Sequence, residues 1–275
     1  MNVKIVAVFM ITSLALGVAV AHFSLSDSEY HVAYPMLQND IDMVYQQVEY
    51  GRLGTKILLI NHHLLAPHLI ARALLGVATK NKQTVVLISP NHFSAGDGFA
   101  ITTLYPWKTS YGVLTADREL IKQLVRAGVT IDPVPFQREH GISNIIPFIK
   151  HSLPNARIVP IMVRDTANPR EIDVLAQTLP SDVLVIGSFD FSHEVTSSVA
   201  DTQDAQAIAT LKAFDITAVS DLSLDSRPGL RFLMQYAALQ DKRRFVLLGA
   251  TNSAKILKRP DQPDVTSYIT GYFTD

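Results

Sequence analysis

Short runs of apolar residues alternate with helix-length segments along the chain from residue 56 onward. The runs are rich in Val, Ile and Leu and have no polar face, so we expect strands that are covered on both faces of a sheet. A last run, residues 267–273, alternates more between apolar and polar positions and predicts an edge strand. The strands that contain these apolar runs are predicted at residues 56–60, 84–89, 157–163, 182–187 and 244–248.

Segments with helical spacing of apolar residues lie mostly between these strands. Such an alternation places helices on both sides of the sheet. The sequence therefore predicts the α/β class, as a three-layer sandwich with a mostly parallel or mixed central sheet. No internal repeat or low-complexity linker divides the chain, which predicts one domain over residues 55–275. The helices are predicted at residues 40–50, 67–80, 117–127, 142–153, 169–179, 202–214 and 228–240.

The first 21 residues differ from the rest of the chain. Lys4 precedes an uncharged apolar run, residues 5–21, that contains the small pair Ala19 and Ala21 near its end. Such a segment is typical of a secretory signal peptide, and it is also just long enough for an uncleaved membrane anchor. Under either interpretation we expect the domain outside the cytoplasmic membrane, secreted or membrane-anchored. Residues 22–54 are then a linker or N-terminal extension.

Composition narrows the functional classes. The formal net charge is −1 and no long run of Lys or Arg occurs, which argues against a nucleic-acid partner. There is no cysteine, so the chain offers neither a disulfide framework nor a thiolate ligand. Any metal site must be built from His, Asp and Glu, a donor set that suits iron, copper, manganese or zinc.

Histidines gather at the expected strand ends. His62 and His63 follow the first strand, His92 follows the second, His193 follows the fourth, and His140 precedes a predicted helix. Because ligands of open α/β sheets bind beyond the carboxyl ends of the strands, we expect His62 and His92 to project into one crevice, where two imidazoles can share a metal ion. His63 cannot easily point the same way as its neighbour. The alternative for each histidine is a loop-capping role.

Three further polar groups belong to the same region. Asp190 and His193 follow an apolar strand, three residues apart, and predict an acid–base or imidazole-orienting pair; a cap or Asx-turn is the alternative for Asp190. Glu139 precedes a predicted helix, where a charged helix start is the alternative to a functional role, and Asn91 either binds a ligand or shapes a turn. No G-x-S-x-G, P-loop or G-x-G-x-x-G motif occurs, which removes the best-marked hydrolase and nucleotide-binding classes.

Several short motifs, taken together and in order, resemble those of Memo-like proteins, also called AmmeMemoRadiSam system protein B. The resemblance covers residues 56–275, and its most specific part is the Asp-Phe-Ser-His block that ends at His193. The motifs are Asn-His at 61–62, Ser-Pro-Asn-His at 89–92, Tyr-Gly-Val-Leu-Thr-Ala-Asp at 111–117, Glu-His at 139–140, Pro-Phe at 147–148, Ile-Val-Pro-Ile at 158–161, Ser-Phe-Asp-Phe-Ser-His at 188–193 and Ile-Thr-Gly-Tyr-Phe at 269–273.

The resemblance implies a fold related to the class III extradiol dioxygenases and a pocket for iron or copper. It implies that His62 and His92 bind the metal and that Asp190 and His193 lie beside it. The chain departs from the family in the third ligand, which is commonly a Cys. The corresponding stretch here is Asp-Ser-Arg-Pro-Gly at 225–229, with Arg227 in the place of the Cys, and arginine cannot bind a metal.

Three arrangements are compatible with this departure. Asp225 completes a set of two histidines and one carboxylate; or the metal has fewer protein ligands and more water; or no metal binds, and Arg227 and the histidines form a pocket for a small anion or peptide. The first two predict a Memo-like metalloprotein with oxidoreductase-type activity, and the last a non-catalytic binding module. A metal-dependent hydrolase is a third hypothesis. The residues expected to contact a small-molecule or anionic ligand are Asn91, His63, His140, Glu139 and Arg227.

Overall fold

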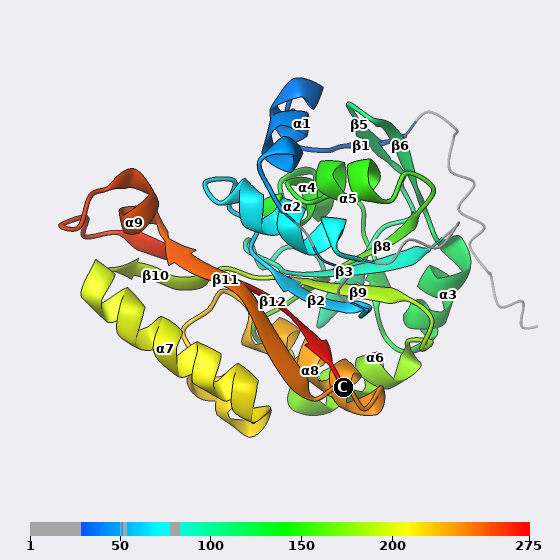
Figure 1. The fold of residues 1–275 in the computed structure, drawn as a ribbon. Helices are drawn as coiled ribbons and strands as arrows, with labels where there is room; N and C mark the ends of the chain where they lie inside the picture. Colours follow the sequence, from blue (N-terminus) through cyan, green and yellow to red (C-terminus); the bar gives the residue numbers. More distant parts are fainter. Residues whose placement is uncertain (1–28, 50, 52–53, 78–82) are drawn as a thin grey trace, which may run out of the picture.

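The computed structural model describes residues 29–49, 51, 54–77 and 83–275 of the chain. Four parallel strands form the middle of its sheet (Figure 1). Their carboxyl ends lie along one edge, because all four run in the same direction. In spatial order they are β8 (Arg157–Val163), β3 (Thr84–Pro90), β9 (Leu184–Ser188) and β2 (Ile57–Ile60).

Antiparallel pairs make the sheet mixed rather than purely parallel. On one side, β12 (Val265–Thr274) is antiparallel to β2 and to both β10 (Phe191–Val195) and β11 (Arg244–Asn252). The expectation of an edge strand at residues 267–273 is therefore wrong, since β12 has partners on both sides. On the other side, β6 (Gly112–Ala116) is parallel to β8 and antiparallel to β5 (Trp107–Thr109).

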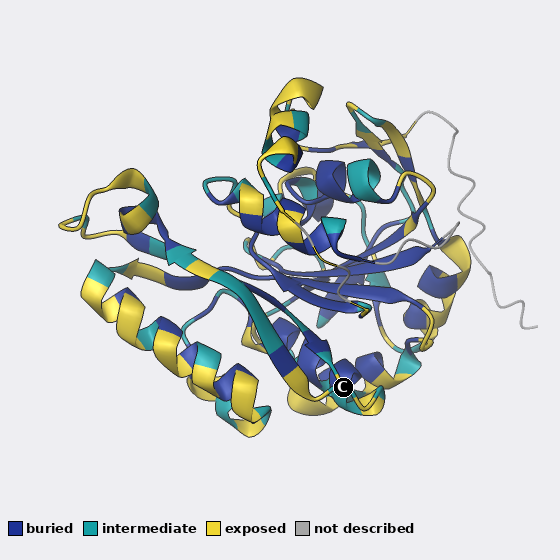
Figure 2. Cartoon of the chain, viewed as in Figure 1, coloured by how far each residue is buried: buried dark blue, intermediate teal, exposed yellow. Residues whose placement is uncertain are grey.

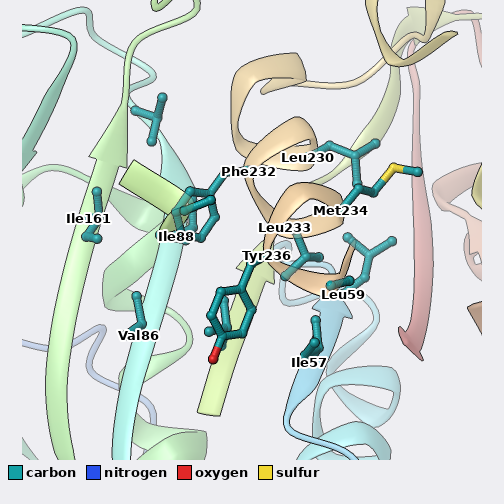
Figure 3. Packing of buried hydrophobic residues seen from close by; sticks show 14 of the residues in the cluster. Ile57, Leu59, Val86, Ile88, Ile161, Leu230, Phe232, Leu233, Met234 and Tyr236 are labelled. Carbon is teal, nitrogen blue, oxygen red and sulfur yellow. The ribbon is translucent and has the colours of Figure 1, made fainter. Parts of the chain in front are cut away.

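Helices cover both faces of the sheet, and alternate strand residues enter two separate cores (Figure 2). In β2, Ile57 and Leu59 face one core, and Leu58 and Ile60 face the other, all of them buried. This alternation confirms the three-layer α/β sandwich. Four helices pack against the first core: α3 (Arg118–Arg126), α6 (Pro169–Thr178), α7 (Ser197–Ala213) and α8 (Arg227–Leu239). Figure 3 shows this packing for α8. The second core is covered by α1 (Gln38–Gln46), α2 (Pro67–Leu75), α4 (His140–Ser143) and α5 (Ile146–Ser152).

Two elements differ from their predicted form. The helix expected over residues 142–153 is divided into α4 and α5, because Pro147 lies in the first turn of α5 and has no N–H to continue the α4 ladder. The segment around His193, expected to be a turn, is strand β10, whose register shifts against β12. The remaining short elements are β1 (His31–Val32), β4 (Ala100–Thr102), β7 (Thr130–Ile131), η1 (Pro135–Gln137), η2 (Thr217–Asp221) and α9 (Ser253–Leu257).

The described part of the N-terminal extension packs on the domain. Strand β1 pairs with β5, and helix α1 buries Ile41 and Tyr45 in the second core. Residues 1–21, which predict a signal peptide or membrane anchor, lie outside the described residues. Within the part of the chain that the structure does describe, no helix combines the length and the apolar character needed to cross a membrane.

His31 fastens this extension and makes its packing sensitive to pH. The side chain is 3% exposed, its Nε2 lies 2.9 Å from Thr103 Oγ1, and its ring packs 4.6 Å from that of Trp107. Burial lowers the pKa of His31 from 6.5 to about 4. The unfolded chain therefore binds one more proton than the folded chain between these values, so stability is complete above pH 6.5 and is lost as the pH falls toward 4.

We expect His31 to contribute about 3 kcal/mol of this acid destabilisation, at about 1.4 kcal/mol per pKa unit. Urea unfolding of wild type and of His31→Gln at a series of pH values measures it. The glutamine keeps a hydrogen-bonding group opposite Thr103 but does not titrate, so its stability should fall less steeply between pH 6.5 and 4. Equal slopes for the two proteins would contradict the assignment.

Candidate metal centre

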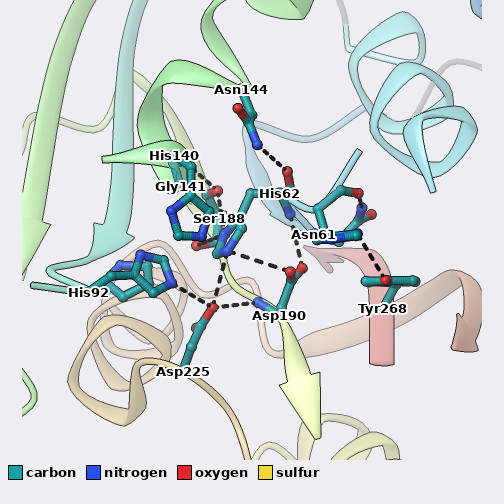
Figure 4. A network of polar contacts seen from close by, with 12 residues as sticks. Asn61, His62, His92, His140, Gly141, Asn144, Ser188, Asp190, Asp225 and Tyr268 are labelled. Carbon is teal, nitrogen blue, oxygen red and sulfur yellow. Dashed lines mark hydrogen bonds and ion pairs between the residues drawn. The ribbon is translucent and has the colours of Figure 1, made fainter. Parts of the chain in front are cut away.

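The carboxyl ends of the parallel strands bring the predicted residues together (Figure 4). His62 follows β2, His92 follows β3, and Asp190 follows β9. Asp225 enters from the loop before α8. The His62 ring centroid lies 5.1 Å from that of His92, with the two rings nearly perpendicular. The expectation of two imidazoles in one crevice is thus met by the geometry.

The contacts of His62 fix which of its nitrogens carries the proton. Its Nδ1 lies 3.3 Å from both the carbonyl oxygen and Oγ of Ser188, and that hydroxyl donates its own proton to the Gly141 carbonyl at 2.7 Å. Ser188 therefore accepts, and Nδ1 is the protonated nitrogen. This leaves an unprotonated lone pair on Nε2, the form of imidazole that binds a metal ion.

Carboxylate oxygens face that lone pair. Asp225 Oδ2 lies 3.4 Å from His62 Nε2 and 3.7 Å from His92 Nε2, and Asp190 Oδ2 lies 3.5 Å from His62 Nε2. Neighbouring donors of a tetrahedral ion with bonds of about 2.0–2.1 Å are separated by about 3.3–3.4 Å. The donor atoms therefore have the spacing of a coordination shell, and a cation between them would remove the repulsion of lone pairs that face one another.

Asp225 has an unused acceptor as well. Its side chain is 7% exposed, and its Oδ1 is buried without a hydrogen-bond partner among the described residues. An unpaired buried carboxylate oxygen is costly, and the cost disappears when the carboxylate binds a cation. The spacing of the donor atoms and the unpaired oxygen of Asp225 are thus two independent observations that fit a metal ion.

Glu139 orients the second histidine. It is fully buried, and its Oε1 lies 2.6 Å from His92 Nδ1, while its two oxygens accept from the backbone N–H groups of His92 and Gly141. The arrangement directs His92 Nε2 toward Asp225 and is the carboxylate–histidine pairing found behind many metal ligands. Glu139, expected to contact a ligand, instead lies beneath His92, out of contact with solvent.

His140 is the third imidazole of the cluster. One ring nitrogen each of His62, His92 and His140 lie within 4.8 Å of one another, which makes these three residues a possible metal-binding group. The ring of His140 is 44% exposed and stacks on that of His92 at 4.0 Å. Since stacked rings direct their lone pairs side by side rather than toward one point, Asp225 is the better third donor, and His140 borders the open side.

Burial and charge set the protonation of the metal-free site. Burial, with the neighbouring histidines, lowers the pKa of His62 well below its usual value. Burial also disfavours the charge on His92, but hydrogen bonds to Asp225 and Glu139 outweigh it and raise its pKa to about 10. Burial raises the pKa of Asp225 to about 7, against the opposing effect of His92. The proton on His92 therefore stands where a metal cation would bind.

Backbone pairing places the two aspartates. Asp225 N–H donates to the Asp190 carbonyl at 3.1 Å, and Asp190 N–H donates to Asp225 Oδ2 at 2.9 Å. Asp190 Oδ1 in turn accepts from the backbone N–H of His62 at 3.0 Å. Close packing holds this segment, because a Cβ on Gly187 or on Gly229 would lie 2.5 Å from the ring of Phe189.

Three of the residues predicted to contact a ligand make polar contacts with other parts of the protein. Both polar atoms of the Asn91 side chain bond the backbone of Ala95, so Asn91 shapes its turn. His63 Nδ1 contacts Tyr268 Oη at 3.0 Å, beside the cluster. Arg227 binds the Leu222 carbonyl and lines a different pocket, in which none of the cluster residues takes part. The residue of this stretch that faces the histidines is Asp225.

His193 lies on β10 at the exposed edge of the site. Burial lowers its pKa, and the charge of Asp190 opposes that effect. Two supporting residues were not singled out by sequence reasoning. Asn144 donates to the His62 carbonyl at 3.1 Å, and Ser188 sets the His62 tautomer. Ser188 had two signals, its position at a strand end and its place at the start of the motif at residues 188–193; Asn144 had none.

Known proteins support the resemblance. A family profile described as "Memo-like protein" matches residues 25–262. A MEMO1 family protein from Caldivirga maquilingensis is 32% identical over 139 residues, which are 47% of this chain and 49% of the relative. The match thus spans about half the length of that relative. A MEMO1 family protein from Methanothermobacter thermautotrophicus is 28% identical over 200 residues, 69% of this chain and 71% of the relative.

Among solved structures, an uncharacterized protein, JW3007, from Escherichia coli K12 has a TM-score of 0.49 and 9% identity. The superposition covers 78% of this chain and 98% of that one.

Proposed function

The chain belongs to the Memo-like protein family, and from this premise we propose that His62, His92 and Asp225 hold one divalent transition-metal ion. The observation that carries the proposal is the position of Asp225 Oδ2, 3.4 and 3.7 Å from the Nε2 atoms of the two histidines. The other nitrogen of each ring is bonded elsewhere, to Ser188 and to Glu139. Both rings therefore have Nε2 as the available ligand atom.

The donor types favour iron(II) over copper(I). Two imidazoles and a carboxylate form the set that non-haem iron oxygenases use, whereas copper(I) prefers sulfur ligands, which this chain does not supply from cysteine. Copper(II) binds nitrogen and oxygen ligands tightly and would compete in vitro. An iron ion held by these three residues would supply oxidoreductase-type chemistry.

The residues around the open side have separate tasks in this proposal. His140 and His193 border it and are exposed enough to contact a small-molecule substrate. His193 is neutral near pH 7, because burial lowers its pKa, and is therefore able to accept a proton from the substrate. Asp190 stabilises the resulting positive charge on the ring and holds the backbone of His62 in place.

Metal analysis of the full chain tests the proposal. The protein is purified without a polyhistidine tag, stripped with chelator, reloaded anaerobically with iron(II) and freed of loosely bound ion. We expect about one equivalent of iron to remain, because His62, His92 and Asp225 form one donor set for one ion. Less than about a tenth of an equivalent of any transition metal after reloading would reject the proposal.

Glu139 should control affinity without binding the metal. Glu139→Gln preserves the shape of the side chain but weakens its bond to His92 Nδ1, so His92 is held less firmly and is a weaker donor. We expect iron(II) affinity to fall by about 10- to 100-fold, the usual cost of losing such a partner. Competition with a chelating dye measures it, and Glu119→Gln, on the exposed face of α3, is the matched control. Unchanged affinity in Glu139→Gln would contradict this role.

The apolar run at residues 5–21 supports a further part of the proposal, a domain located outside the cytoplasmic membrane. Protease treatment of intact cells and of spheroplasts tests the location. Digestion of the domain only after the cells are lysed would contradict it.

A further inference from the structure

A second pocket, apart from the metal centre, lies between α6, η2 and α8. It has a volume of about 210 Å³. The turn before α8 separates the two places: Asp225 faces the histidines, Ser226 caps the helix by accepting from the N–H of Gly229, and Arg227 lines the pocket. Asp225 and Arg227 are only two residues apart, yet their side chains belong to two different sites.

The guanidinium of Arg227 is held in place, but not all of its N–H groups have hydrogen-bond partners among the described residues. Its Nε donates to the Leu222 carbonyl at 3.0 Å, which holds the side chain in place. Its Nη1 is 3.9 Å from Asp165 Oδ2, too far for a hydrogen bond, and that carboxylate is itself 63% exposed. The terminal nitrogens therefore remain able to form the paired N–H contacts that recognise a carboxylate.

The charge around the pocket suits a ligand with one negative charge. Arg231 also lines the pocket, but its Nε and Nη2 already bind both oxygens of Asp173, at 3.1 and 2.9 Å. One guanidinium is thus available, since its only ionic partner in the described part of the chain, Asp165, is 3.9 Å away and exposed; the Asp165 carboxylate would repel a dianion more strongly than a monoanion. A dianion such as phosphate would be left partly unbalanced.

The remaining lining suits a short apolar group. Ile172 and Val219 are buried residues of the first core that reach the pocket wall, and Pro169 and Ile216 add further apolar surface. The volume is below the roughly 300–1,000 Å³ of sites for drug-sized ligands, so the pocket fits a compound of a few carbon atoms.

From these features we propose that the pocket binds a small monocarboxylate with a short apolar tail. The carboxylate pairs with Arg227, and the tail lies against Ile172 and Val219. The site is independent of the metal centre, since none of the proposed metal ligands lines it.

Ligand-observed NMR titration of the full chain with 3-methylbutanoate tests the proposal. We expect saturable binding with a Kd on the order of 1 mM, in keeping with the affinity available to a ligand of about seven non-hydrogen atoms. Arg227→Gln should weaken binding at least about tenfold, the loss expected for a charge-assisted contact. The matched control Arg126→Gln, on the exposed face of α3, should bind as wild type does.

Two further arms keep the test decisive if Arg227→Gln folds poorly. Ala167→Leu places a larger apolar side chain in the pocket lining, leaves Arg227 itself unchanged, and should abolish binding. The neutral analogue 3-methylbutanamide should bind at least about tenfold more weakly than the acid, because it cannot form the charged pair. No saturable binding to wild type, equal binding of the amide, or equal competition by inorganic phosphate would each overturn the proposal.

Discussion

Asp225→Asn is expected to lower iron(II) affinity at least about 100-fold while the chain stays folded, because one charged ligand of the three is lost. Asparagine has nearly the shape of aspartate but no charge. In the metal-free protein, burial raises the pKa of Asp225 to about 7, so the folded state disfavours the charged carboxylate at this position. Chelator competition gives the affinity, and urea unfolding of the metal-free protein gives the stability.

Two variants make this result specific. Asp221→Asn, in exposed η2, changes a nearby carboxylate that contacts none of the histidines and should bind iron(II) as wild type does. His140→Gln separates the two possible third ligands. If His140→Gln lost the metal and Asp225→Asn retained it, the three-histidine set would be the correct one, and the assignment of Asp225 would be wrong.

Metal affinity should also depend steeply on pH, falling as the pH decreases. The ion takes the place of the proton on His92, whose pKa is raised to about 10 by Asp225 and Glu139 despite burial. Below that pH, each further decrease of one pH unit lowers the metal affinity by about a factor of ten. Asp225, with a pKa of about 7, adds a second proton under acidic conditions. From about pH 8 to pH 6 we expect a loss of roughly 100- to 1,000-fold.

Cobalt(II), whose visible spectrum reports nitrogen and oxygen ligands, is a suitable probe for this titration. Glu139→Gln removes one of the two carboxylates that hold the proton on His92, so its affinity should change less steeply with pH than that of wild type. A wild-type affinity that is constant over the same range would show that no protonated group is displaced, contrary to the site described here.

The core of the fold was predictable because its strands are apolar on both faces. Residues 57–60 have no polar position, and this is the pattern of a strand between two helical layers. The hydrophobic pattern gave the wrong prediction for residues 267–273. Their alternation of apolar and polar residues is typical of a strand with one solvated face, whereas β12 lies inside the sheet, between paired strands. The sequence did not predict the short strand β10, because its polar residues do not form an apolar strand pattern.

The part of the site that follows directly from the strand ends was predictable from the sequence. His62 and His92 follow β2 and β3, which are separated in the sheet by β9 alone, and the carboxyl ends of parallel strands lie on the same side of the sheet. The direction of a side chain in a loop is a different matter. Asp225 and Arg227 are two residues apart, and only the Ser226 cap and the bonds between Asp225 and Asp190 decide which of them faces the histidines. Such tertiary contacts leave no periodic signal in the sequence.

The most direct measurement is an anomalous-difference map from a crystal of the full chain loaded with iron(II), collected at the iron edge. The site described here predicts one strong peak at about 2.0–2.2 Å from His62 Nε2, His92 Nε2 and an oxygen of Asp225. A peak bound by His140 in place of Asp225, or no peak among these residues at full loading, would contradict it.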